Sequence, residues 1–249
     1  IPHGPISIGF TPDEEVGRGA DHFDIEKFDA DFAYTMDGDT EGEIQYENFN
    51  AADAIFEIQG VNVHPGSAKD VMVNAALVAM EINAALPCGE TPADTEDYEG
   101  FYHLVSMSGD VACAKLHYIV RDHDADKFAA RLETLKEISK QMNLKWGFGT
   151  VKLTIDEQYR NMAEIIEDGN MHLIENAKKA CAATDVTPLI LPIRGGTDGA
   201  RLSFMGLPCP NLGTGGHGYH GPFEHITAEG MDKAVDVMIE LVKLYAEMK

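Results

Sequence analysis

The order of apolar patterns between residues 50 and 158 constrains the fold more than any other feature of the chain. Strand-like and helix-like periods follow one another there as strand, helix, strand, strand, helix, strand. This order is typical of a split β-α-β unit, a two-layer sandwich of roughly 100 residues. The predicted elements are strand 54–58, helix 71–86, strands 101–107 and 114–120, helix 124–142 and strand 151–155.

Each helix of this unit carries one apolar stripe, which we expect to pack against the sheet. Asp124 stands where it can cap the second helix, because an aspartate oxygen accepts the backbone N–H groups of a first helical turn. The two stripes are Val71, Ala75, Val78, Ile82 and Leu86 in the first helix, and Phe128, Leu132, Leu135, Ile138 and Met142 in the second.

The segments before and after this unit have the pattern of a larger α/β domain. Residues 6–10 predict a strand that ends at Thr11-Pro12, and residues 31–36 predict a second strand. The later predicted elements are helix 162–182, a short buried strand 188–193, helix 198–205, strand 208–212, and helix 228–249 with the stripe Met231, Val235, Met238, Val242 and Tyr245.

We therefore expect an α/β fold in which a two-layer α+β domain is inserted into an open-sheet domain. The expected boundaries are 1–49 for the first part of the larger domain, 50–158 for the insert, and 159–249 for the second part. In open α/β sheets, sites form beyond the carboxyl ends of the strands. Both early strands are followed by acidic residues, so we expect a site there.

The composition is strongly acidic, with 19 Lys and Arg against 42 Asp and Glu and a net charge of -23. Such a surface repels phosphate backbones and anionic membranes, which disfavours nucleic-acid and membrane partners. The four cysteines form no Cys-x-x-Cys pair, which favours reduced thiols in a cytoplasmic protein. No apolar run approaches the ~20 residues that cross a bilayer, and the first residues do not resemble a secretory signal.

The acidic triplet Asp13-Glu14-Glu15 follows the first predicted strand. An arbitrary acidic triplet is most often a solvated loop. The position after a strand and the nearby Gly17 and Gly19 favour a functional site, because glycine allows close backbone approach. In an extended segment successive side chains point opposite ways, so Glu15 could hold a metal ion while Glu14 faces a bound water as general base.

Asp37 follows the second predicted strand and precedes a glycine, a routine place for a turn aspartate. Beside a metal site on a neighbouring strand it would be a second ligand. The loop 213–222 is rich in glycine but lacks the lysine of a phosphate-binding loop. Its His217 and His220 suit metal ligation better, although either could bond the backbone instead, and His225 is expected to be structural.

Two arginines and one histidine also stand at element ends. Arg194 lies at a strand-to-helix turn, where it can bind a carboxylate through two parallel hydrogen bonds. Arg121 and His64 each end a strand of the inserted unit. Surface ion pairing and loop packing are the alternative roles for these three residues.

Five segments together resemble the peptidase T group of the family of two-zinc aminoacylases, carboxypeptidases and dipeptidases. They are 10–19 (FTPDEEVGRG), 34–38 (YTMDG), 60–67 (GVNVHPGS), 194–207 (RGGTDGARLSFMGL) and 211–221 (NLGTGGHGYHG). The resemblance runs in order over essentially the whole chain. It implies a zinc peptidase whose larger α/β domain is catalytic, and a pair of zinc ions about 3.5–4 Å apart.

For individual residues, the resemblance implies that Glu14 is the general base and that Glu15 and His220 bind one zinc ion. Asp37 would bind the other, and His217 has no ligand role in the family. The substrates would be tripeptides, from which the N-terminal residue is released.

The resemblance also implies that the inserted domain is a lid that mediates homodimerisation. His64 would stabilise the oxyanion of the scissile carbonyl, and Arg121 and Arg194 would hold carboxylate or main-chain groups of the peptide.

The chain departs from the family at a few places. Gly218 and Pro222, beside the histidine ligand, replace the commoner asparagine and basic residue of the group. The family takes a His-x-Asp motif and a bridging aspartate from a segment before TPDEE, whereas His22-Phe23-Asp24 follows it here. We therefore expect Ile1 to be an interior point of a longer protein. Two alternatives remain: an incomplete fragment with only a folding and dimerisation role, and a carboxypeptidase or deacylase.

Overall fold

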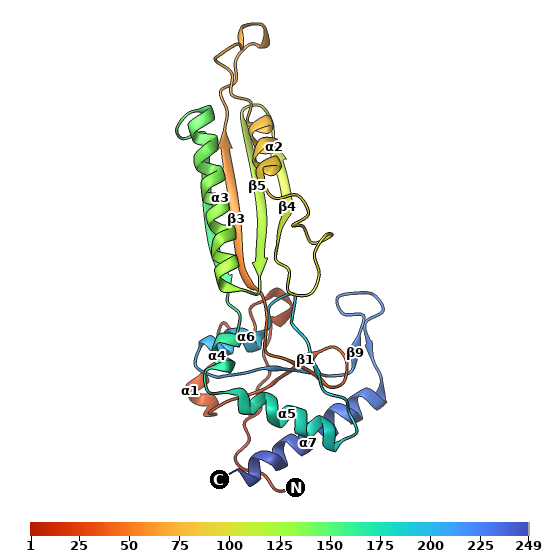
Figure 1. Cartoon of the computed structure of the whole chain (residues 1–249). Helices are drawn as coiled ribbons and strands as arrows, with labels where there is room; N and C mark the ends of the chain where they lie inside the picture. Colours follow the sequence, from red (N-terminus) through yellow and green to blue (C-terminus); the bar gives the residue numbers. More distant parts are fainter. Residues whose placement is uncertain (249) are drawn as a thin grey trace. The chain divides into compact units, whose positions relative to one another are not determined.

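The computed structural model describes residues 1–248, which divide into two compact units. One unit combines residues 1–48 with residues 160–249, and the other is the continuous segment Phe49–Tyr159. Figure 1 shows the elements of both units along the colour ramp of the sequence. We call them the discontinuous unit and the continuous unit.

The continuous unit is a four-stranded antiparallel sheet with two helices, as its sequence pattern predicts. The strands lie in the order β4 (Phe101–Gly109), β5 (Cys113–Asp122), β3 (Asn50–Gln59) and β6 (Val151–Tyr159). Both α2 (Ala75–Ala85) and α3 (Ala125–Trp146) pack on this sheet, and Figure 1 shows α3 running along β3. A short 3-10 helix, Pro65–Ser67, lies between β3 and α2. The chain order strand, helix, strand, strand, helix, strand is confirmed.

Apolar periodicity explains why these elements pack as they do. Alternate residues of β3 are buried, and Phe56 pairs across the sheet with Leu116 and Leu153. The predicted stripe of α3 is confirmed, and Asp124 caps the helix by accepting the Lys127 N–H at 2.9 Å. In α2 the middle of the predicted stripe is buried, but the helix starts after Val71, which is 53% exposed.

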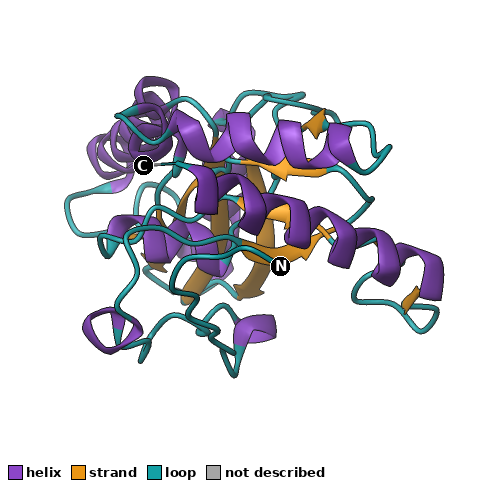
Figure 2. Ribbon diagram, turned by 90° about the horizontal axis from the view of Figure 1, so that it is seen from below, coloured by secondary structure: helices purple, strands orange, loops and turns teal. Residues whose placement is uncertain are grey.

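The discontinuous unit has a mixed sheet with the strand order β1-β8-β2-β7. β1 pairs parallel to β8 and β2 parallel to β7, while β2 and β8 are antiparallel. The sheet is open, and Figure 2 shows the helices of this unit over its strands, with α5 and α7 packed together. The strands are β1 (Thr35–Gly38), β2 (Glu43–Gln45), β7 (Leu189–Ile190) and β8 (Asn211–Gly213), and a separate ribbon joins β9 (Gly216–His217) to β10 (His225–Ile226).

The helices of this unit are short, apart from α5 and α7. They are α1 (Ile25–Phe28), α4 (Ala163–Glu167), α5 (Met171–Ala183), α6 (Asp198–Phe204) and α7 (Ala228–Glu247). The predicted helix 162–182 is thus divided into α4 and α5. The division falls at Gly169, whose φ of 87° an α-helix does not allow.

Two further predictions for this unit are wrong, and a third, the stripe of α7, is confirmed only in its later residues, of which Tyr245 packs against the core. Residues 6–10 are exposed and form no strand, because no described strand pairs with them. The predicted strand 188–193 shrinks to β7, whose residues are exposed rather than buried. In α7 the buried face is Gly230, Ala234, Val237 and Leu241, whereas Met231 and Val235 of the predicted stripe are 48% and 47% exposed.

Residue 249, the end of the predicted helix 228–249, lies outside the described residues. Across residues 1–248 no helix has the length and apolar character to cross a membrane. The four cysteines are free thiols, with Cys181 and Cys209 buried and the other two exposed. Burial raises the pKa of the Cys209 thiol to about 12, so this thiol remains protonated.

Candidate metal and catalytic site

The acidic segment forms a tight turn rather than the end of a strand. Glu14–Val16 is a 3-10 helix between two left-handed residues, Asp13 with φ 63° and Gly17 with φ 70°. The Gly17 N–H closes it by donating to the Glu14 carbonyl at 2.6 Å. The prediction of an extended segment with alternating side chains is therefore wrong, because the two left-handed residues bend the chain at both ends.

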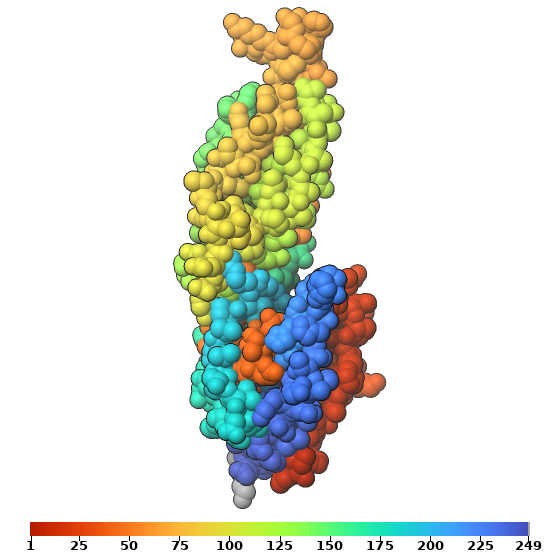
Figure 3. All heavy atoms as spheres, turned by 90° about the vertical axis from the view of Figure 1, so that its right-hand side faces the viewer, coloured from red at the N-terminus to blue at the C-terminus, as the bar shows by residue number. Residues whose placement is uncertain are grey.

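The turn meets the glycine-rich loop from the far end of the sequence. His220 Nδ1 lies 3.0 Å from Glu15 Oε2, and both side chains reach solvent. Figure 3 shows the N-terminal residues, in red, beside the blue segment that contains this loop. The structure thus brings together the imidazole and the carboxylate that were predicted to bind the same zinc ion.

Several contacts hold His220 in this place. Its φ is 57°, a left-handed conformation that is uncommon for a residue with a side chain, and its N–H donates to Glu224 Oε2 at 2.9 Å. The neighbouring Tyr219 hydroxyl donates to the Gly38 carbonyl at 3.2 Å. This hydrogen bond ties the loop to β1, one residue after Asp37.

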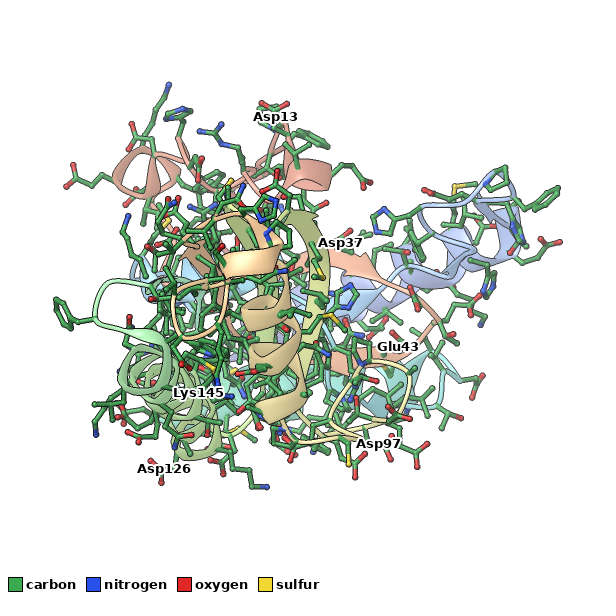
Figure 4. All side chains as sticks on the ribbon, turned by 90° about the horizontal axis from the view of Figure 1, so that it is seen from above. Asp13, Asp37, Glu43, Asp97, Asp126 and Lys145 are labelled. Atoms are coloured by element: carbon green, nitrogen blue, oxygen red, sulfur yellow. The ribbon has the colours of Figure 1, made fainter. Side chains whose placement is uncertain are left out.

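Asp37 lies within β1 and shares the electrostatic environment of the acidic turn. Its side chain reaches the surface but is flanked by dense protein, and this partial loss of water raises its pKa, with further increases from Asp198 and Glu15. Burial also raises the pKa of Glu14, followed by the charges of Asp37 and Asp198. Figure 4 labels Asp37 on β1 and Asp13 at the entry to the turn.

The chemical types of these donors suit a divalent cation. Carboxylate oxygens and one imidazole nitrogen are zinc ligands, and a bound cation would relieve the mutual repulsion of the carboxylates. Asp198 Oδ2 is buried with no hydrogen-bond partner in the described residues, which adds an uncompensated oxygen to the cluster. Within residues 1–248, no three His, Cys, Asp or Glu side chains are arranged to hold a metal ion together.

The three predicted substrate-binding residues lie in different parts of the fold. Arg194 is exposed in the discontinuous unit, next to Ile193, which forms an isolated parallel bridge with Asn48. His64 and Arg121 belong to the continuous unit. His64 Nδ1 accepts the Gly66 N–H at 3.1 Å, and the half-buried Arg121 guanidinium lies 5.2 Å from the centre of the Tyr159 ring.

The remaining histidines of the glycine-rich region lie on a β-ribbon. His217 and His225 are on the paired strands β9 and β10, with ring centroids 5.5 Å apart. Two polar residues near the acidic turn, Asp198 and Arg201 of α6, were missed by the sequence analysis. Both lie in the quoted segment 194–207, from which only Arg194 was selected.

Comparisons with known proteins agree with this architecture. The M20 peptidase dimerisation domain matches residues 46–147. Peptidase T of Clostridium perfringens is 56% identical over 247 residues, which cover 99% of this chain and 61% of that protein. The aminopeptidase PepT of Bacillus cereus superposes with a TM-score of 0.82 at 25% identity, over 95% of this chain and 63% of that one.

A further structure shows likeness in fold alone. The Bacillus subtilis protein YXEP, described as a dinuclear metal-binding peptidase of the M20 family, has a TM-score of 0.68 at 15% identity, over 96% of this chain and 65% of that one. Residues 46–147 thus resemble the dimerisation domain of the M20 peptidase family, and the chain as a whole is similar to peptidases. Its sequence is similar to peptidase T, and it spans about 61% of the length of the first such relative.

Proposed function

We propose that this chain is part of a two-zinc aminopeptidase that releases the N-terminal residue of tripeptides. The single observation that carries the proposal is the meeting of Glu15 with His220, 3.0 Å apart, beside Glu14 and Asp37. The similarity to peptidase T and the name of the B. cereus aminopeptidase support the same activity.

The chain's own residues have distinct roles in this proposal. Glu15 and His220 would hold one zinc ion and Asp37 the other, and bound zinc would polarise the peptide carbonyl and lower the pKa of water. Glu14 takes a proton from the attacking water and returns it to the leaving amine. Arg121 and Arg194 would hold carboxylate or main-chain groups of the peptide, and His64 would stabilise the oxyanion of its scissile carbonyl.

Metal analysis of the full-length protein tests the ligand assignment. We expect His220→Ala to lower zinc affinity at least about tenfold, because a catalytic zinc ion usually has only three protein ligands. Zinc content after dialysis and competition with a chelator would measure this. His217→Ala, in the same loop, is the matched control and should keep full zinc content. Equal zinc affinity in both variants would remove His220 from the ligand set.

Substrate assays separate the aminopeptidase from the related amide hydrolases. An aminopeptidase should hydrolyse a free tripeptide and leave its N-acetylated form intact, whereas a deacylase should show the reverse preference. Zinc binding without hydrolysis of either peptide would favour a non-catalytic role.

We also propose that the continuous unit mediates homodimerisation, supported by the match to a dimerisation domain. The exposed face of α2 carries Leu77 and Met80, which are 54% and 60% exposed, and β4 is an edge strand. Lysine at both positions should turn a dimer into a monomer in light scattering after gel filtration, because charges oppose apolar association. Leu144→Lys, at a 78% exposed position of α3, is the control. A dimer that survives the double substitution would place the interface elsewhere.

A further inference from the structure

The turn that carries Glu14 and Glu15 is followed by residues 17–21, and the buried part of this segment is attached to α6. The Ala20 N–H donates to Asp198 Oδ1 at 3.1 Å, and both residues are buried. These two residues are 178 positions apart in the sequence. Hydrogen bonds from a backbone N–H to a carboxylate are about twice as strong as those between neutral groups, so this contact is a firm attachment for an otherwise exposed segment.

The exposed end of the same segment is attached to α6 by Arg201. Arg201 Nη1 donates to the Gly17 carbonyl at 2.8 Å, and its Nη2 forms an ion pair with Asp21. Asp21 also receives a hydrogen bond from Arg18 Nε at 3.0 Å. Asp198 and Arg201, one turn apart on one helix, therefore bind residues 17–21 from two sides.

The packing at this point leaves no room for adjustment. A Cβ atom on Gly19 would lie 1.9 Å from Asp198 Oδ2. Only glycine at this position allows the backbone to approach the carboxylate closely enough for the Ala20 hydrogen bond. Ala20 itself belongs to a small apolar cluster with Leu202 and Leu207, which fixes the chain behind the carboxylate.

The turn has few internal restraints of its own. They are three backbone hydrogen bonds: the Val16 and Arg18 N–H groups donate to the Asp13 carbonyl at 3.3 and 3.0 Å, and the Gly17 N–H donates to the Glu14 carbonyl at 2.6 Å. None of the residues Glu14–Val16 is buried. Apart from the exposed Glu15–His220 contact, its position relative to β1 and the glycine-rich loop therefore depends on the segment that follows it.

We propose that Asp198 and Arg201 are positioning residues, which fix the Glu14–Glu15 turn so that its carboxylates face Asp37 and His220. The catalytic consequence rests on the proposed function, whereas the attachment itself does not. Neither residue is assigned a contact with substrate. Gly19 also contributes to this attachment, because the absence of a side chain leaves the space that the Asp198 carboxylate occupies.

Hydrogen exchange in the full-length protein tests the attachment without reference to activity. In Asp198→Ala the peptide containing residues 13–21 should exchange about tenfold faster or more, because the hydrogen bond to Ala20 is lost. Asp198→Asn keeps an oxygen that can accept this N–H, so it should restore most of the protection. Arg201→Gln removes the ion pair with Asp21 at the other end of the segment. Because the Arg201 side chain is 36% exposed, this variant is the least able to disturb folding.

Zinc affinity gives the second readout. We expect Asp198→Ala to weaken zinc binding by about 10–100-fold, the usual effect of removing a group that orients a ligand. Asp198→Asn keeps the hydrogen bond to Ala20 but not the charge, so it should bind zinc more tightly than Asp198→Ala does. Asp236→Ala, an exposed position on α7, is the matched control and should change neither exchange nor zinc affinity.

The outcomes distinguish this proposal from the proposed function. Unchanged exchange of residues 13–21 in Asp198→Ala and Arg201→Gln would overturn it, as would faster exchange spread evenly over the discontinuous unit. Faster exchange confined to the turn would support it even if the wild type bound no zinc, in which case the proposed function alone would fail.

Discussion

Glu14→Gln is expected to lower kcat for a free tripeptide by about 10²–10⁴-fold in the full-length protein, with zinc content unchanged. Glutamine has the shape of glutamate but no basic oxygen, so it cannot take the proton of the attacking water. Glu14 is partly buried next to Glu15, and its carboxylate interacts with Asp37 and Asp198. In the proposed function, a general base needs such a position beside the metal ligands.

Steady-state kinetics combined with metal analysis would separate the possible roles of Glu14. A loss of kcat with full zinc content would support the general base, whereas loss of zinc would make Glu14 a ligand instead. Glu26→Gln, at an exposed position of α1 in the same unit, is the control and should leave both quantities unchanged. Undiminished turnover in Glu14→Gln would show that Glu14 is not the general base.

Asp122→Ala is expected to lower the free energy of unfolding of the continuous unit by about 3–5 kcal/mol. The Asp122 side chain is 1% exposed, and its Oδ2 accepts a hydrogen bond from Arg131 Nε at 2.7 Å. The Arg131 side chain is 14% exposed and lies over the Tyr102 ring, 5.1 Å from its centre. Removal of the carboxylate leaves this guanidinium with the half-exposed Glu90 as its ionic partner.

Urea denaturation followed by tryptophan fluorescence would measure this loss. Trp146 is the sole tryptophan of the chain and lies at the end of α3, so its emission reports on the continuous unit. Lys136→Ala breaks an exposed pair with Glu133 on the same helix and should cost at most about 1 kcal/mol. Equal midpoints for the two variants would show that burial does not strengthen the Asp122–Arg131 pair.

The continuous unit could be predicted from local pattern because its elements follow one another along the chain. Its core comes from alternate strand residues and from one stripe on each helix, and these periods are visible without tertiary information. The α3 stripe and its Asp124 cap are both confirmed. The predicted start of α2 at Val71 is too early. An apolar residue just before a helix can continue the helical spacing, so the pattern does not show where the helix begins.

The discontinuous unit was harder to predict because its elements come from two separate segments of the chain, so their contacts do not follow from local patterns. α7 has one broad apolar face on which the predicted stripe and the buried stripe lie side by side, so the sequence alone does not show which of them meets α5. The pattern of residues 6–10 resembles a strand, but a strand needs a neighbour, and none of the described strands pairs with this segment. The extended reading of Glu14 and Glu15 failed because backbone dihedrals at Asp13 and Gly17 decide the local path.

The sequence by itself determined the class of fold and the resemblance to peptidases, and it predicted the residue types of the candidate site. The ordered motifs predicted that Glu14, Glu15, Asp37 and His220 share one site. Only the tertiary structure decided which of them meet and what holds them. The Glu15–His220 contact and the attachment of Ala20 to Asp198 join opposite ends of the chain. Such contacts depend on how distant elements pack, which no local period in the sequence encodes.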